Sequence, residues 1–156
     1  MLSKHPRGAV DPVSTLLELV DVPPYGGTRT TLIVVGYHLF GVWYHQALLC
    51  DVVRPRGGSV LQAEFGHKYN TRCLPSSLEE VVGTPNFVRE ASYFVTSLNG
   101  DRSEDFKRVV HHLLRYPHWH WPNYDKLYNN CWDFCRAVCR GMDLQYGNTL
   151  SHKASL

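Results

Sequence analysis

The chain contains the stretch Tyr128-Asn129-Asn130-Cys131-Trp132-Asp133-Phe134-Cys135, which places a cysteine directly behind two asparagines. Asparagine is a favoured helix N-cap, because its side-chain oxygen accepts a backbone N–H that has no partner at the start of a helix. Residues 131–140 contain neither proline nor glycine, and Gly141 follows as a natural stop. The stretch therefore predicts a helix that begins at Cys131.

A thiol in the first turn of a helix lies at the positive end of the helix dipole. That position lowers the pKa of the thiol and favours the thiolate, which is the nucleophilic form of cysteine. Cys131 is therefore a candidate nucleophile, and the rest of the chain has to supply its base.

The composition is that of one globular domain. The chain has 156 residues, of which 44% are hydrophobic and 19% are charged. Its formal net charge of +2 is too small to argue for a nucleic-acid partner. A membrane-spanning helix needs about 18 or more consecutive apolar residues, and no such run exists in the sequence. We therefore expect no nucleic-acid partner and no membrane span.

The cysteines and the N-terminal sequence suggest a compartment. The polar start, Met1 to Arg7, lacks the apolar core of a signal peptide. There are five cysteines, an odd number, and Cys131, Cys135 and Cys139 follow one another at intervals of four on the predicted helix. Cysteines spaced in this way do not pair readily with one another. We expect reduced thiols and a cytoplasmic or nuclear location.

The chain divides into a flexible arm at residues 1–15, a domain at 16–145 and a flexible tail at 146–156. Apolar and β-branched runs separated by turns predict strands, which hairpins would join into an antiparallel sheet. The predicted strands are residues 16–22, 30–35, 42–53, 60–65 and 93–97. The predicted fold class is α+β, with a small antiparallel sheet packed against helices.

Two further helices are expected. Ser76 or Ser77 precedes Glu79 and Glu80 and indicates a helix start. The run Asp101-Arg-Ser-Glu104 resembles a capping box, with aspartate in place of serine or threonine, and apolar residues follow it at helical spacing until Pro117. The aromatic and histidine-rich segment 116–121 is predicted to be a surface loop that either covers the core or forms a substrate-binding rim.

A cysteine nucleophile needs a base, usually a histidine that is close in space and distant in sequence. His45 is the best placed of the nine histidines, because it lies within an apolar strand pattern, Phe40 to Leu49. A strand holds an imidazole ring in a fixed position. The alternative is a core histidine satisfied by one hydrogen bond.

These motifs resemble those of the PPPDE peptidases, also called the DeSI type. Phe40-Gly-Val-Trp-Tyr-His45 is similar to the family's histidine strand, and Gln62-Ala-Glu-Phe-Gly66 is similar to the strand that follows it. Tyr128 to Phe134 is similar to its cysteine helix start, although Trp132-Asp133 replaces the usual Asn-His. Histidine precedes cysteine, which is the order of circularly permuted papain-like (NlpC/P60-related) proteins.

The resemblance implies a cysteine peptidase or isopeptidase that hydrolyses conjugates of ubiquitin or of a ubiquitin-like modifier such as SUMO. Its partners would be these conjugates and other protein substrates, and no cofactor is implied. Cys131 would be the nucleophile and His45 the general base, and the reaction would pass through a thioester acyl-enzyme.

The same resemblance suggests supporting residues. The backbone N–H of Cys131 is the first expected oxyanion donor, and the second remains open among the side chains of Asn130, Gln46 and Tyr44. Glu64, on a neighbouring strand, is a candidate to orient His45 or a solvated strand residue. The substrate-groove candidates are Trp43, Trp132 and Gly66.

Other functions remain possible. A thioesterase or acyltransferase acting on lipid thioesters would use the same two residues, and a non-catalytic module would bind modifiers without cleaving them. A metal site on the cysteine stripe is disfavoured, because no second short-spaced pair of ligands is present. Cys135 and Cys139 are instead predicted to be small core residues.

Overall fold

The computed structural model describes residues 16–22, 26–40, 43–66 and 69–142. In that part of the chain, five antiparallel strands form one sheet in the order β4-β3-β2-β1-β5, accompanied by three α-helices. This confirms the predicted α+β class with a small antiparallel sheet. The predicted arm, 1–15, and tail, 146–156, lie outside the described residues.

The strands, apart from the one at residues 69–76, overlap the apolar runs predicted from the sequence. They are β1 (Arg29–Phe40), β2 (Trp43–Val53), β3 (Gly58–Gly66), β4 (Tyr69–Ser76) and β5 (Phe87–Asn99). The helices are α2 (Leu78–Gly83), α3 (Ser103–Leu113) and α4 (Cys131–Gly141), with two short 3-10 turns, η1 (Pro117–Trp119) and η2 (Trp121–Asn123). The helix start at Ser77 is confirmed, because the side chain of Ser77 caps α2 by accepting the N–H of Glu80 at 3.1 Å.

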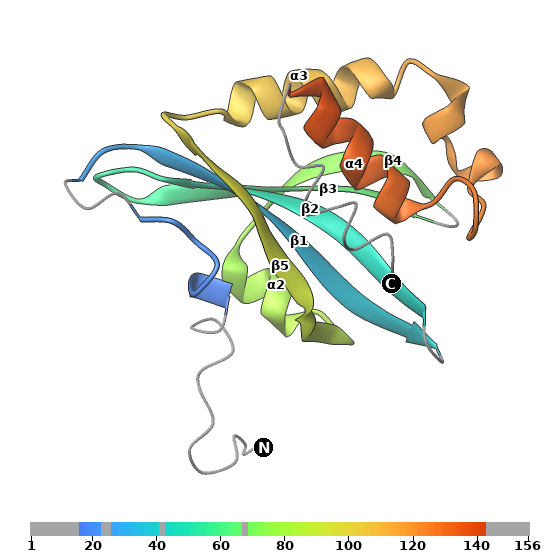
Figure 1. Ribbon diagram of the computed structural model, residues 1–156, viewed down its shortest axis with the longest axis horizontal. Coiled ribbons are helices and arrows are strands. Elements are labelled where there is room, and N and C mark those ends of the chain that lie inside the picture. The colour runs from blue at the N-terminus through green and yellow to red at the C-terminus, as the bar shows by residue number, and fades with distance from the viewer. Residues whose placement is uncertain (1–15, 23–25, 41–42, 67–68, 143–156) are drawn as a thin grey trace, which may run out of the picture.

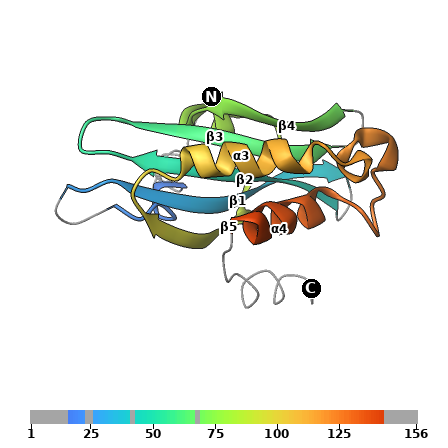
Figure 2. The same cartoon turned by 90° about the horizontal axis from the view of Figure 1, so that it is seen from above.

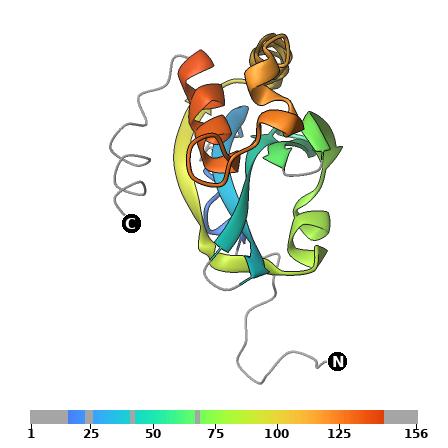
Figure 3. The same ribbon diagram turned by 90° about the vertical axis from the view of Figure 1, so that its right-hand side faces the viewer.

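The sheet is covered on both faces. Helices α3 and α4 pack on one face and α2 lies on the other (Figures 1 and 3). Leu32 and Val34 of β1 belong to the core under α3 and α4, whereas Ile33 and Val35 belong to the core on the α2 side. Burial on both faces explains why this part of β1 is continuously apolar rather than alternating.

Residues 16–22 do not form the strand that the sequence predicted. The N–H of Leu19 donates to the carbonyl of Leu16, and the N–H of Val20 donates to that of Leu17, so the segment is a helical turn. Leu16 is fully buried against the α2 side of the sheet. The leucines of this short run therefore belong to a single helical turn. The apolar pattern alone could not distinguish such a turn from a strand.

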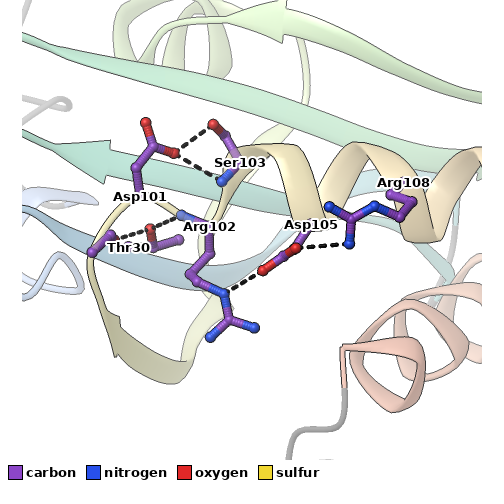
Figure 4. Close-up of polar contacts among 7 residues, drawn as sticks. Thr30, Asp101, Arg102, Ser103, Asp105 and Arg108 are labelled. Carbon is purple, nitrogen blue, oxygen red and sulfur yellow. Dashed lines mark hydrogen bonds and ion pairs between the residues drawn. The ribbon is translucent and has the colours of Figure 1, made fainter.

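The start of α3 also differs from the expected capping box. The N-cap is Arg102, which makes no side-chain capping bond. Asp101 instead accepts hydrogen bonds from the N–H and the hydroxyl of Ser103, at 2.9 and 2.5 Å (Figure 4). The N–H of Arg102 donates to the hydroxyl of Thr30 at 2.9 Å, which ties the helix start to β1.

Helices α3 and α4 lie side by side over the sheet (Figure 2). Gly141, predicted as a stop, lies in the last turn of α4 and Met142 caps the helix. A Cβ at Gly141 would collide with a methyl group of Val109 on α3. The glycine therefore permits close approach of the two helices. None of the helices in the described part of the chain is long and apolar enough to span a membrane.

Candidate active site

Helix α4 begins at Cys131, as the sequence predicts, and Asn130 is its N-cap. The side-chain oxygen of Asn130 accepts the N–H groups of Trp132 and Asp133 at 3.1 and 3.0 Å, and Asp133 accepts the N–H of Asn130 at 3.1 Å. This is a complete capping box. The amide nitrogen of Asn130 donates to the carbonyl of Lys126 at 2.8 Å. Both the oxygen and the nitrogen of the Asn130 side chain therefore form hydrogen bonds that stabilise the start of the helix.

His45 lies near the beginning of β2 and forms a hydrogen bond with the thiol of Cys131. The backbone N–H of Gln46 also donates to Cys131 Sγ, at 3.3 Å. Strands β2 and β3 pair only from Leu48 opposite Ala63 onward. The edge of β2 before Leu48 is therefore free of β3 and faces α4 instead. His45 and Cys131, which are separated by 86 positions in the sequence, come into contact there.

Glu64 holds the other side of the His45 ring. His45 Nε2 lies 2.7 Å from Glu64 Oε1, and the side chains of His45 and Glu64 are only 12% and 9% exposed. Because Nε2 is used by Glu64, the ring presents Nδ1 to the sulfur. The second oxygen of Glu64 accepts from Arg72 Nε at 3.1 Å and from Gln62 Nε2 at 3.3 Å. The ring of Tyr37 stacks on His45 with centroids 6.0 Å apart. Contacts from β3 and from β1 therefore hold the imidazole in position.

These contacts shift both pKa values toward an ion pair. Burial alone would raise the pKa of the Cys131 thiol, but the hydrogen bond and charge of His45 and the N–H of Gln46 outweigh burial and lower it. Burial alone would lower the pKa of His45, but the hydrogen bonds and negative charges of Cys131 and Glu64 raise it to about 9. The arrangement favours a thiolate–imidazolium pair over a neutral thiol beside a neutral imidazole.

Tyr124 is a further neighbour of the sulfur that sequence reasoning did not identify. Its hydroxyl forms hydrogen bonds with the side chain and the backbone N–H of Cys131. Burial, followed by the negative charge of Cys131, raises the pKa of Tyr124, so the hydroxyl remains a donor. Tyr124 precedes the cysteine by seven positions in a segment with no helical or strand periodicity, so the sequence gives no signal for it.

A pocket of about 870 Å³ opens over these residues. Most of its exposed wall is apolar, although many of the residues that line it are polar or charged. The lining includes Leu39, Trp43, Tyr44, Tyr124, Lys126 and Trp132, together with Cys131, His45 and Glu64. Lys126 Nζ lies 5.8 Å from the centre of the Trp43 ring, so a cation–π contact joins the two walls.

The structure brings most of the predicted site residues together. Cys131, His45, Gln46, Tyr44, Glu64, Asn130, Trp43 and Trp132 all line the pocket. Gln46 approaches the sulfur through its backbone, whereas the sequence suggested its side chain. Gly66 is not one of the lining residues and instead pairs with Tyr69 at the end of β3. Arg72 and Tyr37 were not predicted, because their roles depend on strand neighbours that only the folded sheet defines.

The other cysteines of α4 have the core role that the sequence predicts. Cys135 and Cys139 are fully buried, and burial raises the pKa of each thiol above its ordinary value. All five cysteines are free. Among the described residues, no group of three or more histidine, cysteine, aspartate or glutamate side chains is arranged to hold a metal ion.

The segment 116–121 does not form an open loop. Its two 3-10 turns bring Trp119 into the core, where the indole packs edge-on against Phe65 and Phe134 with centroids 5.6 and 5.5 Å away. Trp119 is only 9% exposed, and none of residues 116–121 lines the pocket over Cys131. Of the two interpretations of this segment, the structure supports a cover for the core.

Comparison with known proteins adds no relative: no protein-family model, curated protein or solved structure matches the chain.

Proposed function

We propose that this protein is a cysteine hydrolase in which Cys131 is the nucleophile, His45 is the general base and acid, and Glu64 positions His45. The observation that carries the proposal is the hydrogen-bonded series Cys131, His45, Glu64, assembled from a helix start and two strands at the base of one pocket. A nucleophile, a base and a group that orients the base are the parts that acyl transfer through cysteine requires.

The chemistry follows from these positions. The thiolate of Cys131 attacks a substrate carbonyl and forms a C–S bond, while the carbonyl electron pair moves onto oxygen. When that pair returns, the bond to the leaving group breaks and His45 gives its proton to the departing atom. Neutral His45 then takes a proton from water, whose oxygen attacks the thioester. The acid product leaves, and the thiolate and imidazolium are restored.

As the preferred substrate class, we propose conjugates of ubiquitin or of a ubiquitin-like modifier such as SUMO. The support is the resemblance to PPPDE peptidases, together with a histidine strand that precedes a cysteine helix, the order of a circularly permuted papain-like fold. The extended C-terminal tail of a modifier would enter between the start of β2 and the start of α4. The free thiols are consistent with a reducing compartment, the cytoplasm or the nucleus.

A second candidate is a thioesterase or acyltransferase acting on lipid thioesters. The observation that favours it is the size of the pocket and its largely apolar lining, which includes Leu39, Trp43 and Trp132. Apolar pockets of this size suit small ligands or acyl chains. Both candidates use the same mechanism and differ in what occupies the pocket.

A module that binds without cleavage is the third alternative. A long separation between Cys131 and His45 would have favoured it. The two side chains are instead within hydrogen-bonding reach of each other, which removes that argument.

The test is covalent labelling with two sets of electrophiles, one built on the C-terminal tails of ubiquitin-like modifiers and one on fatty-acyl groups. The proteins compared are the wild type, Cys131→Ala, His45→Ala and Cys73→Ala. Cys73 is a partly exposed thiol on β4, so its variant controls for nonspecific labelling. We expect labelling of the wild type and Cys73→Ala by one set only, and none of Cys131→Ala. Labelling that survives in Cys131→Ala would overturn the proposal.

A further inference from the structure

Tyr124 is placed beside Cys131 by a closed loop. Asp125 and Asn129 exchange two backbone hydrogen bonds, at 2.8 and 3.0 Å, and form an isolated antiparallel bridge. Inside it, the carboxylate of Asp125 accepts the N–H groups of Leu127 and Tyr128 at 2.8 and 3.0 Å. The bridge brings the residue that enters the loop, Tyr124, next to the helix start that follows it.

The loop is also anchored to the segment before it. Asn129 is buried, and its side-chain amide donates to the carbonyls of His118 and Asn123 at 2.7 and 3.0 Å. The ring of Tyr124 packs edge-on against Phe65, with centroids 5.0 Å apart. The ring is therefore held in place by the core, and its hydroxyl end lies in the pocket next to Cys131.

Two hydrogen-bond donors meet next to the sulfur of Cys131. The hydroxyl of Tyr124 forms hydrogen bonds with Cys131 Sγ and with the backbone N–H of Cys131. The capping side chain of Asn130 takes the N–H groups of Trp132 and Asp133 and leaves that of Cys131 for other partners. An N–H in the first turn of a helix is directed out of the helix and available to a ligand.

We infer that the Tyr124 hydroxyl is a catalytic oxyanion donor and that, with the backbone N–H of Cys131, it forms the oxyanion hole. This inference rests on the proposed function. In the reaction, negative charge leaves the sulfur and develops on the carbonyl oxygen bound next to it. That oxygen takes the place of the hydroxyl oxygen as acceptor of the Cys131 N–H and accepts the hydroxyl proton in a hydrogen bond. Tyr124 keeps its proton throughout.

Two of the side chains that the sequence suggested as second donor, Asn130 and Tyr44, are less well placed. The amide nitrogen of Asn130 already donates to the carbonyl of Lys126. Tyr44 is 43% exposed, and its ring makes an edge contact with His38 at 5.8 Å. The backbone N–H of Gln46 points at the sulfur itself, which suits it to the resting thiolate.

Tyr124→Phe keeps the ring against Phe65 and removes only the hydroxyl. The matched control is Tyr128→Phe, because Tyr128 belongs to the same loop but is 83% exposed and does not line the pocket. Two reactions of each purified protein are compared. Iodoacetamide alkylates the thiolate at a saturated carbon and forms no oxyanion. The ester p-nitrophenyl acetate acylates the same sulfur through a tetrahedral oxyanion.

We expect Tyr124→Phe to slow acylation by about 10²-fold or more, the usual loss for one oxyanion donor, and to change alkylation by less than about threefold. Tyr128→Phe should match the wild type in both reactions. Acylation and alkylation that change in parallel would overturn the inference, because Tyr124 would then only tune the thiolate. Unchanged acylation would overturn it as well. A wild type that neither reagent modifies at Cys131 would instead overturn the proposed function.

Discussion

His45 Nε2 lies 2.7 Å from Glu64 Oε1, within a part of the sheet where Glu64 is buried and His45 is largely covered. The contact joins the start of β2 to β3 at the place where the two strands no longer pair. A buried carboxylate at this distance fixes both the orientation and the tautomer of an imidazole. It also stabilises the imidazolium that faces Cys131.

The first prediction is that Glu64→Gln impairs the reaction through His45. The amide keeps the size of the side chain but loses the charge and can hold the wrong tautomer. We expect the maximal rate to fall by about 10²-fold or more, with a smaller effect on KM. We also expect the pKa of Cys131, followed by the ultraviolet absorbance of the thiolate, to rise.

The control for this change is Glu79→Gln, which alters an exposed carboxylate on α2 and should leave rate and titration unchanged. If Glu64→Gln lowered the rate without moving the pKa of Cys131, its role would be structural rather than the positioning of His45.

The second prediction concerns pH. The pKa of Cys131 is lowered, so the thiolate persists below the ordinary titration range of cysteine. The pKa of His45 is raised to about 9, so the imidazolium needed to protonate the leaving group is lost only as the pH rises through that value. Hydrolysis should therefore persist below the ordinary titration range of cysteine and decline above about pH 9.

The variant His45→Gln tests whether the charge of His45 lowers the pKa of Cys131. Without the imidazolium, burial dominates at Cys131 and its pKa moves upward. Alkylation by iodoacetamide at neutral pH should slow by more than about tenfold, one pKa unit or more. An alkylation profile identical to that of the wild type would contradict the proposed ion pair.

Much of the fold follows from local sequence pattern, and the exceptions have physical causes. Strands β1, β2 and β3 contain apolar, β-branched runs between turns, which is enough to predict them. Strand β4, residues 69–76, contains an arginine, a proline and no clear alternation, and it was missed. Its place is set by pairing with β3, where Arg72 lies opposite Glu64. Such a pairing exists only in the folded sheet, so the sequence of residues 69–76 by itself gives no pattern that predicts a strand.

In the candidate site too, some residues could be predicted from local sequence and others are placed only by the tertiary structure. A helix cap and a strand pattern were enough to single out Cys131 and His45, because each depends on residues near it in sequence. The contact of Glu64 with His45 depends on the register of β2 against β3, which the sequence does not reveal. Tyr124 is brought to the sulfur by a loop that a backbone bridge between Asp125 and Asn129 closes, and backbone hydrogen bonds of this kind are almost independent of residue type.

The third prediction tests the close approach of α3 and α4 at Gly141. Alanine favours a helix over glycine by about 1 kcal/mol, but its methyl group would collide with Val109. Overpacking of this kind typically costs about 1–3 kcal/mol. We therefore expect Gly141→Ala to lower the free energy of unfolding, measured by urea denaturation.

Val109→Ala provides the second arm of this experiment. Because it removes the methyl group that collides, Gly141→Ala should become neutral or stabilising in its presence. Equal effects of Gly141→Ala with and without Val109 would show that the contact does not limit packing.

The last prediction separates the two roles of Asn130, which caps α4 and shapes the site. Asn130→Ala removes the acceptor for two backbone N–H groups and the bond to the carbonyl of Lys126. Loss of an N-cap costs about 0.5–2 kcal/mol of stability. Fraying of the first turn also displaces Cys131 from the N–H of Gln46 and from His45, so alkylation of Cys131 should slow as well.

Ser77→Ala is the matched control, because Ser77 caps α2 in the same way but Cys131 lies at the start of another helix. It should cost a similar free energy of unfolding and leave the alkylation rate of Cys131 unchanged. If both variants slowed alkylation equally, the effect of Asn130 would reflect general destabilisation. A selective loss in Asn130→Ala would show that the helix cap is what holds the thiol in its reactive position.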